Sequence, residues 1–164
     1  MDRGSFSVEV VLLIYTIKMT FEGTVFLLRG NHECRQMTSF FNFRTECLYK
    51  YDQETYELFM ETFDALPISC LVNGKFLALH GGISPDLKTV RPRPAYLARS
   101  SRTSTTSTAT RSLPRSACSG KPSAVHLARI CSDILWSDPV EDDKGYCEKT
   151  FKTNEVRGCS YFFG

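Results

Sequence analysis

Two histidines lie in glycine-containing polar segments that follow apolar runs of the sequence. His32 belongs to the segment RGNHE at 29–33, after the apolar run 24–28, and His80 precedes two glycines after the run 75–79. Histidine titrates near neutral pH and also binds metals, and glycine lets the backbone approach a ligand closely. On spacing alone, a metal or acid–base role and a purely structural role are equally supported for this pair.

The side chains in these two segments restrict the kind of metal that could bind. Asn31 offers an amide oxygen and His80 an imidazole nitrogen. This mixed set suits zinc, iron or manganese better than calcium, which takes oxygen ligands only. The third histidine, His126, lies in an irregular part of the sequence, and we assign it no role.

Two arginines lie beside glycines, in the segments Asp2-Arg3-Gly4 and Val156-Arg157-Gly158. A guanidinium group in such a setting can bind two phosphate oxygens at once. For either arginine taken alone, an ordinary surface ion pair is the more frequent role. The segment 136–139, WSDP, is typical of an aromatic residue anchored in the core and followed by a turn. A structural role is favoured for this segment.

Hydrophobic periodicity predicts the elements that would hold these residues in place. We expect helices over 7–20, 38–50 and 53–65, and strands over 24–28, 68–72 and 75–79. Asn73-Gly74 separates the last two strands and is the preferred pair for a two-residue hairpin turn. His32 and His80 would then lie in loops at strand ends, where layered α/β folds place their sites.

Charge and composition divide the chain into three parts. The segment 91–130 has seven Arg, one Lys and no acidic residue, whereas the whole chain carries only +2. It is rich in Ser, Thr and Pro and has no apolar period, so we predict an irregular, solvated linker rather than a surface for anionic partners. The small net charge predicts no nucleic-acid partner. The apolar run 8–15 is too short to span a bilayer, so we expect no membrane association.

Taken together, five segments resemble the serine/threonine phosphoprotein phosphatases, which have the metallophosphoesterase fold. The segments are DRG at 2–4, LRGNHEC at 28–34, HGGISP at 80–85, DILWSDP at 133–139 and RG at 157–158. The resemblance covers about residues 1–90 and 131–164, which we predict to be two stretches of phosphatase core around the insert 91–130. VRGCSYFF at 156–163, with Met37-Thr38 after the second segment, is most similar to the calcineurin catalytic subunit.

The resemblance implies an α/β fold, in which a partial β-sandwich is flanked by helices and is incomplete at both ends. It implies two metal ions, iron and zinc or manganese, that activate a water molecule to attack phosphorus directly. Asn31 and His80 match ligands of one metal, and His32 matches the general acid. Asp2 matches the carboxylate partner of that acid. Arg3 and Arg157 match the groups that bind the substrate phosphate.

The resemblance also implies that parts of the family's active site lie outside this sequence. The family's Gly-Asp-x-His-Gly segment would precede Met1, and its last metal-binding histidine would follow Gly164. We therefore expect the isolated chain to show no phosphatase activity, and a catalytically inactive fragment that at most binds partners is the alternative function. The family's partners are phosphoprotein substrates, a regulatory subunit and calmodulin, although we expect the binding regions for the last two to be absent. A cytoplasmic location is expected, with the nucleus as a second compartment.

Overall fold

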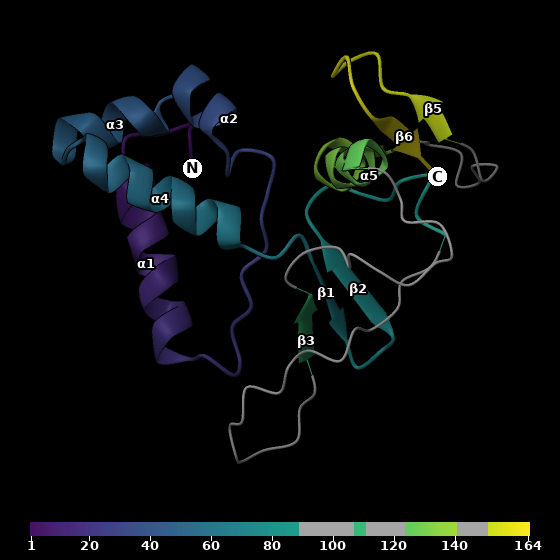
Figure 1. The fold of residues 1–164 in the computed structure, drawn as a ribbon, viewed down its shortest axis with the longest axis horizontal. Coiled ribbons are helices and arrows are strands. Elements are labelled where there is room, and N and C mark those ends of the chain that lie inside the picture. The colour runs from purple at the N-terminus through teal and green to yellow at the C-terminus, as the bar shows by residue number, and fades with distance from the viewer. Residues whose placement is uncertain (89–106, 111–123, 141–150) are drawn as a thin grey trace. The chain divides into compact units, whose positions relative to one another are not determined.

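A computed structural model describes residues 1–88, 107–110, 124–140 and 151–164. The chain forms two compact units, Met1–Pro67 and Ile68–Gly164, and each is described by itself. Figure 1 shows the helices of the first unit and the short sheets of the second. The division after Pro67 differs in position from the boundaries at 90 and 130, which stay a prediction.

The first unit consists of four helices. They are α1 (Ser7–Thr20), α2 (Arg35–Phe40), α3 (Phe43–Lys50) and α4 (Gln53–Ala65). The predicted helices over 7–20 and 53–65 are confirmed to the residue. Asp52 caps α4 by accepting a hydrogen bond from the Thr55 amide at 2.7 Å, and the helix ends just before Leu66-Pro67. No helix in the described part of the chain has the length and apolar character needed to cross a bilayer.

An aromatic core holds these helices together. The rings of Phe43, Phe59 and Phe63 meet with their centroids 5.3–6.3 Å apart. Such tilted and edge-to-face pairs add stability beyond the burial of apolar area. The other buried members of this core come from α1, α3 and α4 and are Val8, Val11, Cys47, Tyr56 and Met60.

Two of the predicted elements of the first unit are wrong. Residues 25–30 form no strand but an extended connection that leads to Asn31. The Arg29 amide donates to the Pro67 carbonyl at 2.8 Å, but this one hydrogen bond does not continue into a strand ladder. The strand was predicted from apolar character alone, which does not determine whether a segment pairs with another strand. The helix expected over 38–50 is two helices, because the backbone is extended at Phe41.

The second unit begins with the predicted hairpin, which is confirmed. Strands β1 (Ser69–Val72) and β2 (Phe76–Leu79) pair in antiparallel register, with Ser69 opposite Leu79. Asn73 and Gly74 have φ of 53° and 66°, the left-handed values that a type I′ turn requires at both positions. Strand β3 (Ser107–Thr110) adds to the other side of β1, which gives the order β2-β1-β3.

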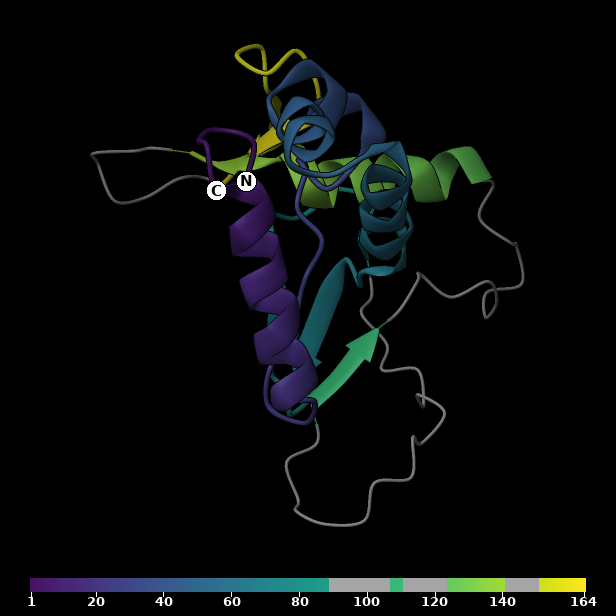
Figure 2. The ribbon, with the colours of Figure 1, turned by 90° about the vertical axis from the view of Figure 1, so that its left-hand side faces the viewer.

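A helix and a second small sheet complete this unit. Helix α5 (Ala124–Trp136), seen lengthwise in Figure 2, is followed by β4 (Asp138–Pro139), β5 (Phe151–Thr153) and β6 (Tyr161–Phe163) in the order β4-β6-β5. The irregular structure predicted for 91–130 is therefore wrong for 107–110 and 124–130, and its remainder lies outside the described residues. Helices and sheets together confirm the predicted mixed α/β class.

A buried carboxylate secures the start of α1. Glu46 accepts hydrogen bonds from the amides of Ser7 and Val8 at 3.1 and 3.0 Å, and Lys50 Nζ donates to it at 2.8 Å. Burial alone would raise the pKa of Glu46, but these hydrogen bonds outweigh it and hold the pKa below its ordinary value. Such a group stabilises the fold above its unfolded-state pKa and loses that effect as the pH falls through its folded-state pKa.

We expect Glu46→Gln to lower the free energy of unfolding by about 2 kcal/mol at pH 7, because two amides and an ammonium lose a charged acceptor. The difference from the wild type should shrink in the acidic range, where Glu46 is itself protonated. Urea unfolding at neutral and acidic pH measures both effects. Glu61→Gln, an equivalent change at an exposed position of α4, is the control. A deficit that stays constant with pH would contradict the role of the charge.

Candidate active site

Asp2 and His32 form a hydrogen-bonded pair in the first unit. His32 Nδ1 lies 2.8 Å from Asp2 Oδ2, and the Asp2 carboxylate is fully buried. A carboxylate only accepts hydrogen bonds, so Nδ1 carries the proton, and Nε2 is left for exchange with a ligand. The arrangement fixes both the tautomer and the direction of the ring.

The backbone around Asp2 is shaped to hold this carboxylate. Asp2 has φ of 68°, a left-handed value that aspartate and asparagine tolerate better than most residues. Its Oδ1 accepts from the Phe43 amide at 3.0 Å, and its own amide donates to Ser7 Oγ at 3.2 Å. Both carboxylate oxygens are therefore occupied, one by α3 and one by the imidazole.

Phe41 joins Arg3 to this pair. Its ring centroid is 4.8 Å from that of His32, and the Arg3 guanidinium carbon lies 5.9 Å from the same ring. A guanidinium over an aromatic face is attracted by the ring quadrupole. The interruption between α2 and α3 thus places an aromatic ring where a positive side chain and the imidazole both contact it.

The turn that carries Asn31 and His32 is closed by two hydrogen bonds that Arg29 and Gly30 donate to Glu33. Arg29 Nε donates to the Glu33 carbonyl at 2.9 Å, and the Gly30 amide donates to Glu33 Oε2 at 2.8 Å. Each end of the turn therefore holds the other. This pattern requires both an arginine and a glutamate at fixed positions, which accounts for two polar residues of the RGNHE segment.

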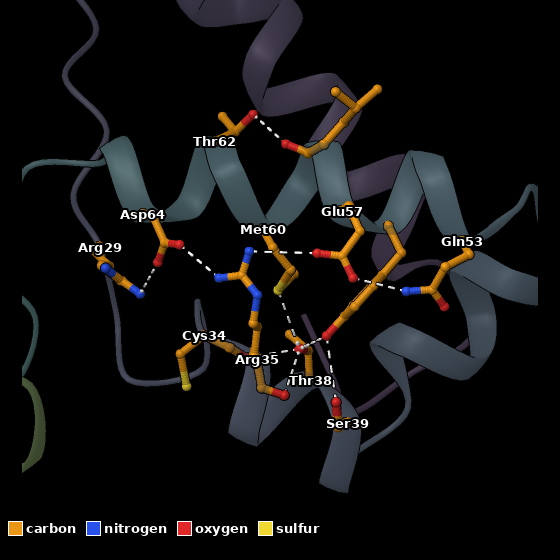
Figure 3. Close-up of polar contacts among 12 residues, drawn as sticks. Arg29, Cys34, Arg35, Thr38, Ser39, Gln53, Glu57, Met60, Thr62 and Asp64 are labelled. Atoms are coloured by element: carbon orange, nitrogen blue, oxygen red, sulfur yellow. Dashed lines mark hydrogen bonds and ion pairs between the residues drawn. The ribbon is translucent and has the colours of Figure 1, made fainter.

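Asp64 of α4 fastens both flanks of this turn. Figure 3 shows the guanidinium groups of Arg29 and Arg35 reaching the two oxygens of Asp64, at 3.0 and 2.7 Å. The hydrogen bond from Arg35, helped by the charge of Arg29, lowers the pKa of Asp64. Arg35 Nη2 also lies 3.5 Å from Oε2 of Glu57, which belongs to α4 like Asp64. One carboxylate thus anchors the segment on either side of His32.

We expect Asp64→Asn to loosen the turn without unfolding the protein. The side chains of Asp64 and Arg35 are about half exposed, so the loss of stability should stay below about 1 kcal/mol. Exchange of the Gly30 amide, measured by NMR, should nevertheless become several-fold faster. The two arginines bind different oxygens of Asp64, and asparagine replaces one of these oxygens with an NH2 group and removes the charge. Glu61→Gln on the same helix is the matched control. Equal exchange rates in the wild type and Asp64→Asn would show that the turn needs no anchor.

In the second unit, His80 follows β2 directly and its side chain is exposed. The next two amides, of Gly81 and Gly82, donate to the Ile134 carbonyl near the end of α5 at 2.9 and 3.3 Å. A Cβ at Gly81 would lie 2.8 Å from that oxygen, and one at Gly82 would lie 1.9 Å from the Phe163 ring. Only glycine allows this close approach, so the two glycines fix the position of the His80 loop.

Arg157 forms a two-point ion pair with Asp138. Its Nε and Nη2 donate to the two carboxylate oxygens, the latter at 2.8 Å. Asn154 is fully buried and supports the pair, because its Nδ2 donates to Asp138 at 2.8 Å and its Oδ1 accepts from the Arg157 amide at 3.1 Å. The Arg157 guanidinium holds the pKa of Asp138 below its ordinary value.

The ring of Trp136 lies 5.8 Å from the Arg157 guanidinium carbon. Asp138 occupies two of the five N–H donors that a guanidinium carries, which leaves three for a phosphate. The WSDP segment, which reads as structural from the sequence, thus orients a predicted phosphate-binding residue.

The predicted site residues therefore fall into two groups. Asp2, Arg3, Asn31 and His32 belong to the first unit, and His80 and Arg157 to the second. The predicted metal ligands, Asn31 and His80, include no carboxylate and belong to different units. No group of three or more His, Cys, Asp or Glu side chains able to hold a metal occurs among the described residues. Asn31 and His80 alone therefore do not make up a metal site.

Three residues near the predicted site residues were assigned no individual role from the sequence. Asp64 and Phe41 are distant in sequence from the partners they hold, and no short motif indicates either. Asp133 carries a signal, since it is an acidic residue between the apolar residues Ile130 and Ile134 of α5, and it is only 5% exposed. A charged residue buried within an apolar helix face indicates a specific partner.

Comparison with known proteins identifies the class to which this fold and site belong. The model of the calcineurin-like phosphoesterase family matches residues 1–164. The chain therefore belongs to the calcineurin-like phosphoesterase family, whose metallophosphoesterase character implies divalent metal ions.

Two curated relatives from Saccharomyces cerevisiae are serine/threonine-protein phosphatase 2B catalytic subunits. Subunit A1 is 36% identical over 170 residues, and subunit A2 is 34% identical over 187 residues. Each alignment covers 99% of this chain but only 27% of the relative, so the chain spans about a quarter of their length.

A solved structure supports the same assignment. It is a protein serine/threonine phosphatase from Saccharomyces cerevisiae with similarity to human phosphatase PP5. It matches with a TM-score of 0.64 and 31% identity, and the match covers all of this chain and 42% of that one. The likeness extends to the fold as well as the sequence.

Proposed function

We propose that this chain serves the hydrolysis of phosphoserine and phosphothreonine in proteins. The observation that carries the proposal is the contact of 2.8 Å between His32 Nδ1 and the buried Asp2 carboxylate. A histidine whose ring is oriented by a carboxylate can act as a general acid. The relatives are named as serine/threonine-protein phosphatases, which supplies the substrate class.

In this reaction the bond between phosphorus and the serine or threonine oxygen breaks while an oxygen of water bonds to phosphorus. The departing alkoxide is a poor leaving group and requires a proton. His32 Nε2 donates that proton, because Nδ1 is held by Asp2, and the Asp2 carboxylate stabilises the imidazolium before the transfer. The metal-activated attack that the resemblance implies, with iron and zinc or manganese, stays a prediction.

Arg3 and Arg157 are the proposed phosphate ligands. A phosphate monoester gains negative charge on its outer oxygens during transfer, and guanidinium groups aimed at those oxygens lower the barrier. Arg157 is already oriented by Asp138 and Asn154, so it presents its remaining donors in a fixed direction. Arg3 is oriented by its contact with Phe41.

The test is the release of phosphate from a phosphothreonine peptide by the protein purified from its native source, in the presence of Mn²⁺. We expect turnover by the native protein. That the recombinant chain 1–164 releases no phosphate above the buffer rate stays a prediction, which the same assay tests. A native protein that releases no phosphate would overturn the proposed hydrolysis.

The second candidate function is a catalytically inactive chain that binds partners. The observation that favours it is the same lack of a three-residue metal group among the described residues. The relatives are named as catalytic subunits, so we propose a regulatory subunit as the first partner to test, with calmodulin and phosphoproteins as further candidates. We propose the cytoplasm as the compartment, with the nucleus as the second one.

A further inference from the structure

Asp133 is a buried carboxylate to which the proposed chemistry gives no task. It lies on α5 with 5% of its surface exposed. Its Oδ2 accepts from the Ser84 hydroxyl at 2.6 Å, and its Oδ1 accepts from the Ser160 hydroxyl at 3.1 Å. Each oxygen is thus used by a different segment of the second unit.

The two serines come from the two loops that carry predicted site residues. Ser84 lies four residues after His80, and Ser160 lies three residues after Arg157. A single rigid group therefore joins the loop 80–84 to the loop 157–160. The Ile134 carbonyl, on the next residue of α5, accepts from the amides of Gly81 and Gly82 and holds the first loop against the same helix.

Ser160 has an uncommon backbone conformation at the point where it contacts Asp133. Ser160 has φ of 61°, a left-handed value that a serine adopts at an energetic cost. Its hydroxyl is held by Asp133, and its carbonyl accepts from the Asn154 amide at 3.1 Å. Asn154 in turn supports the ion pair of Arg157, so the position of Ser160 is transmitted to the guanidinium.

Burying a carboxylate is costly unless strong hydrogen bonds compensate for the lost water. The partners seen here are two hydroxyl groups, and a hydrogen bond to a charged acceptor is about twice as strong as a neutral one. An apolar residue would fill the same space without the free-energy cost of removing a carboxylate from water. It could not, however, accept hydrogen bonds from two loops, so the carboxylate indicates a role in orienting them.

We propose that Asp133 is a positioning residue that couples the His80 loop to the Arg157 loop. The relevance of this coupling to catalysis rests on the proposed phosphatase function. The coupling sets the direction of the Arg157 guanidinium relative to His80, and a change in either loop is transmitted to the other through the carboxylate.

Amide hydrogen exchange of the full chain, without metal or substrate, tests the coupling. We expect Ser84→Ala to accelerate exchange of the Asn154 amide, in the other loop, by about tenfold, and Ser160→Ala to accelerate exchange at Gly81 and Gly82 similarly. Ser137→Ala is the matched control, because Ser137 is 1% exposed and its hydroxyl has no hydrogen-bond partner among the described residues.

A spectroscopic readout addresses the site side chains themselves. The NMR signals of Arg157 Nε–H and of the His80 ring should shift in both Ser84→Ala and Ser160→Ala and stay in place in Ser137→Ala. Effects confined to the loop that carries each substitution would overturn the coupling. The serine variants remove only a hydroxyl, so the test does not depend on a folded Asp133 variant. A native protein without phosphatase activity would overturn the proposed function and leave this result intact.

Discussion

Replacing His32 with glutamine in the native protein is expected to lower kcat for a phosphothreonine peptide by about 10²–10⁴-fold. Glutamine fills similar space but cannot deliver a proton to the departing oxygen. KM should change little, because the proton transfer matters in the transition state and not in the bound substrate. Initial rates of phosphate release over a range of peptide concentrations separate the two constants.

The matched control for this change is His126→Gln. His126 lies on α5, 3.8 Å from Asp86, and its side chain is 43% exposed. We expect its replacement to leave kcat within roughly twofold of the wild type, as for most exposed positions. A similar fall in both variants would show that the loss at His32 reflects a general effect of replacing histidine.

Replacing Asp2 with asparagine is expected to lower kcat by about 10²–10⁴-fold through the imidazole. An amide group at this position can donate to His32 Nδ1, so the ring would place its proton on Nε2 in the neutral form and lose the stabilisation of its charged form. Asparagine also tolerates the left-handed backbone of Asp2 at φ of 68°, so the fold should persist. Kinetics and thermal unfolding, measured on the same preparation, distinguish the two effects.

The double variant shows whether the two residues act as a unit. If Asp2 works only through His32, then Asp2→Asn combined with His32→Gln should lose no more activity than His32→Gln alone. Losses that multiply would instead assign Asp2 an independent role, such as holding the Phe43 amide, to which its Oδ1 is bonded at 3.0 Å.

Local sequence signals predicted the parts of the fold that depend on local physics. The helices 7–20 and 53–65 and the Asn73-Gly74 hairpin follow from apolar period, helix termination and turn preference, and they are confirmed. The run 24–28 has the same apolar character as a strand, but it pairs with no strand among the described residues. Whether a segment forms a β-strand depends on a pairing partner that is distant in the sequence. Hydrophobic periodicity alone therefore could not predict the conformation of residues 24–28.

For the site, the sequence placed Asp2 and His32 together by resemblance, and their contact is seen in the structure. It could not indicate Asp64, because an exposed acidic residue on a helix looks like any solvated one. Nor could it show that Asp138 would hold Arg157, since both lie in short segments separated by residues of unrelated composition. The catalytic, metal-binding and phosphate-binding roles of all the predicted site residues stay predictions.

The most direct test of proton donation by His32 is to measure kcat of the native protein and of its His32→Gln variant on two substrates. Threonine oxygen must be protonated as it leaves, whereas nitrophenolate is stable enough to leave without a proton. If His32 is the general acid, kcat should fall by about 10²–10⁴-fold for a phosphothreonine peptide, and at least tenfold less for p-nitrophenyl phosphate. Equal losses for both substrates would contradict proton donation by His32.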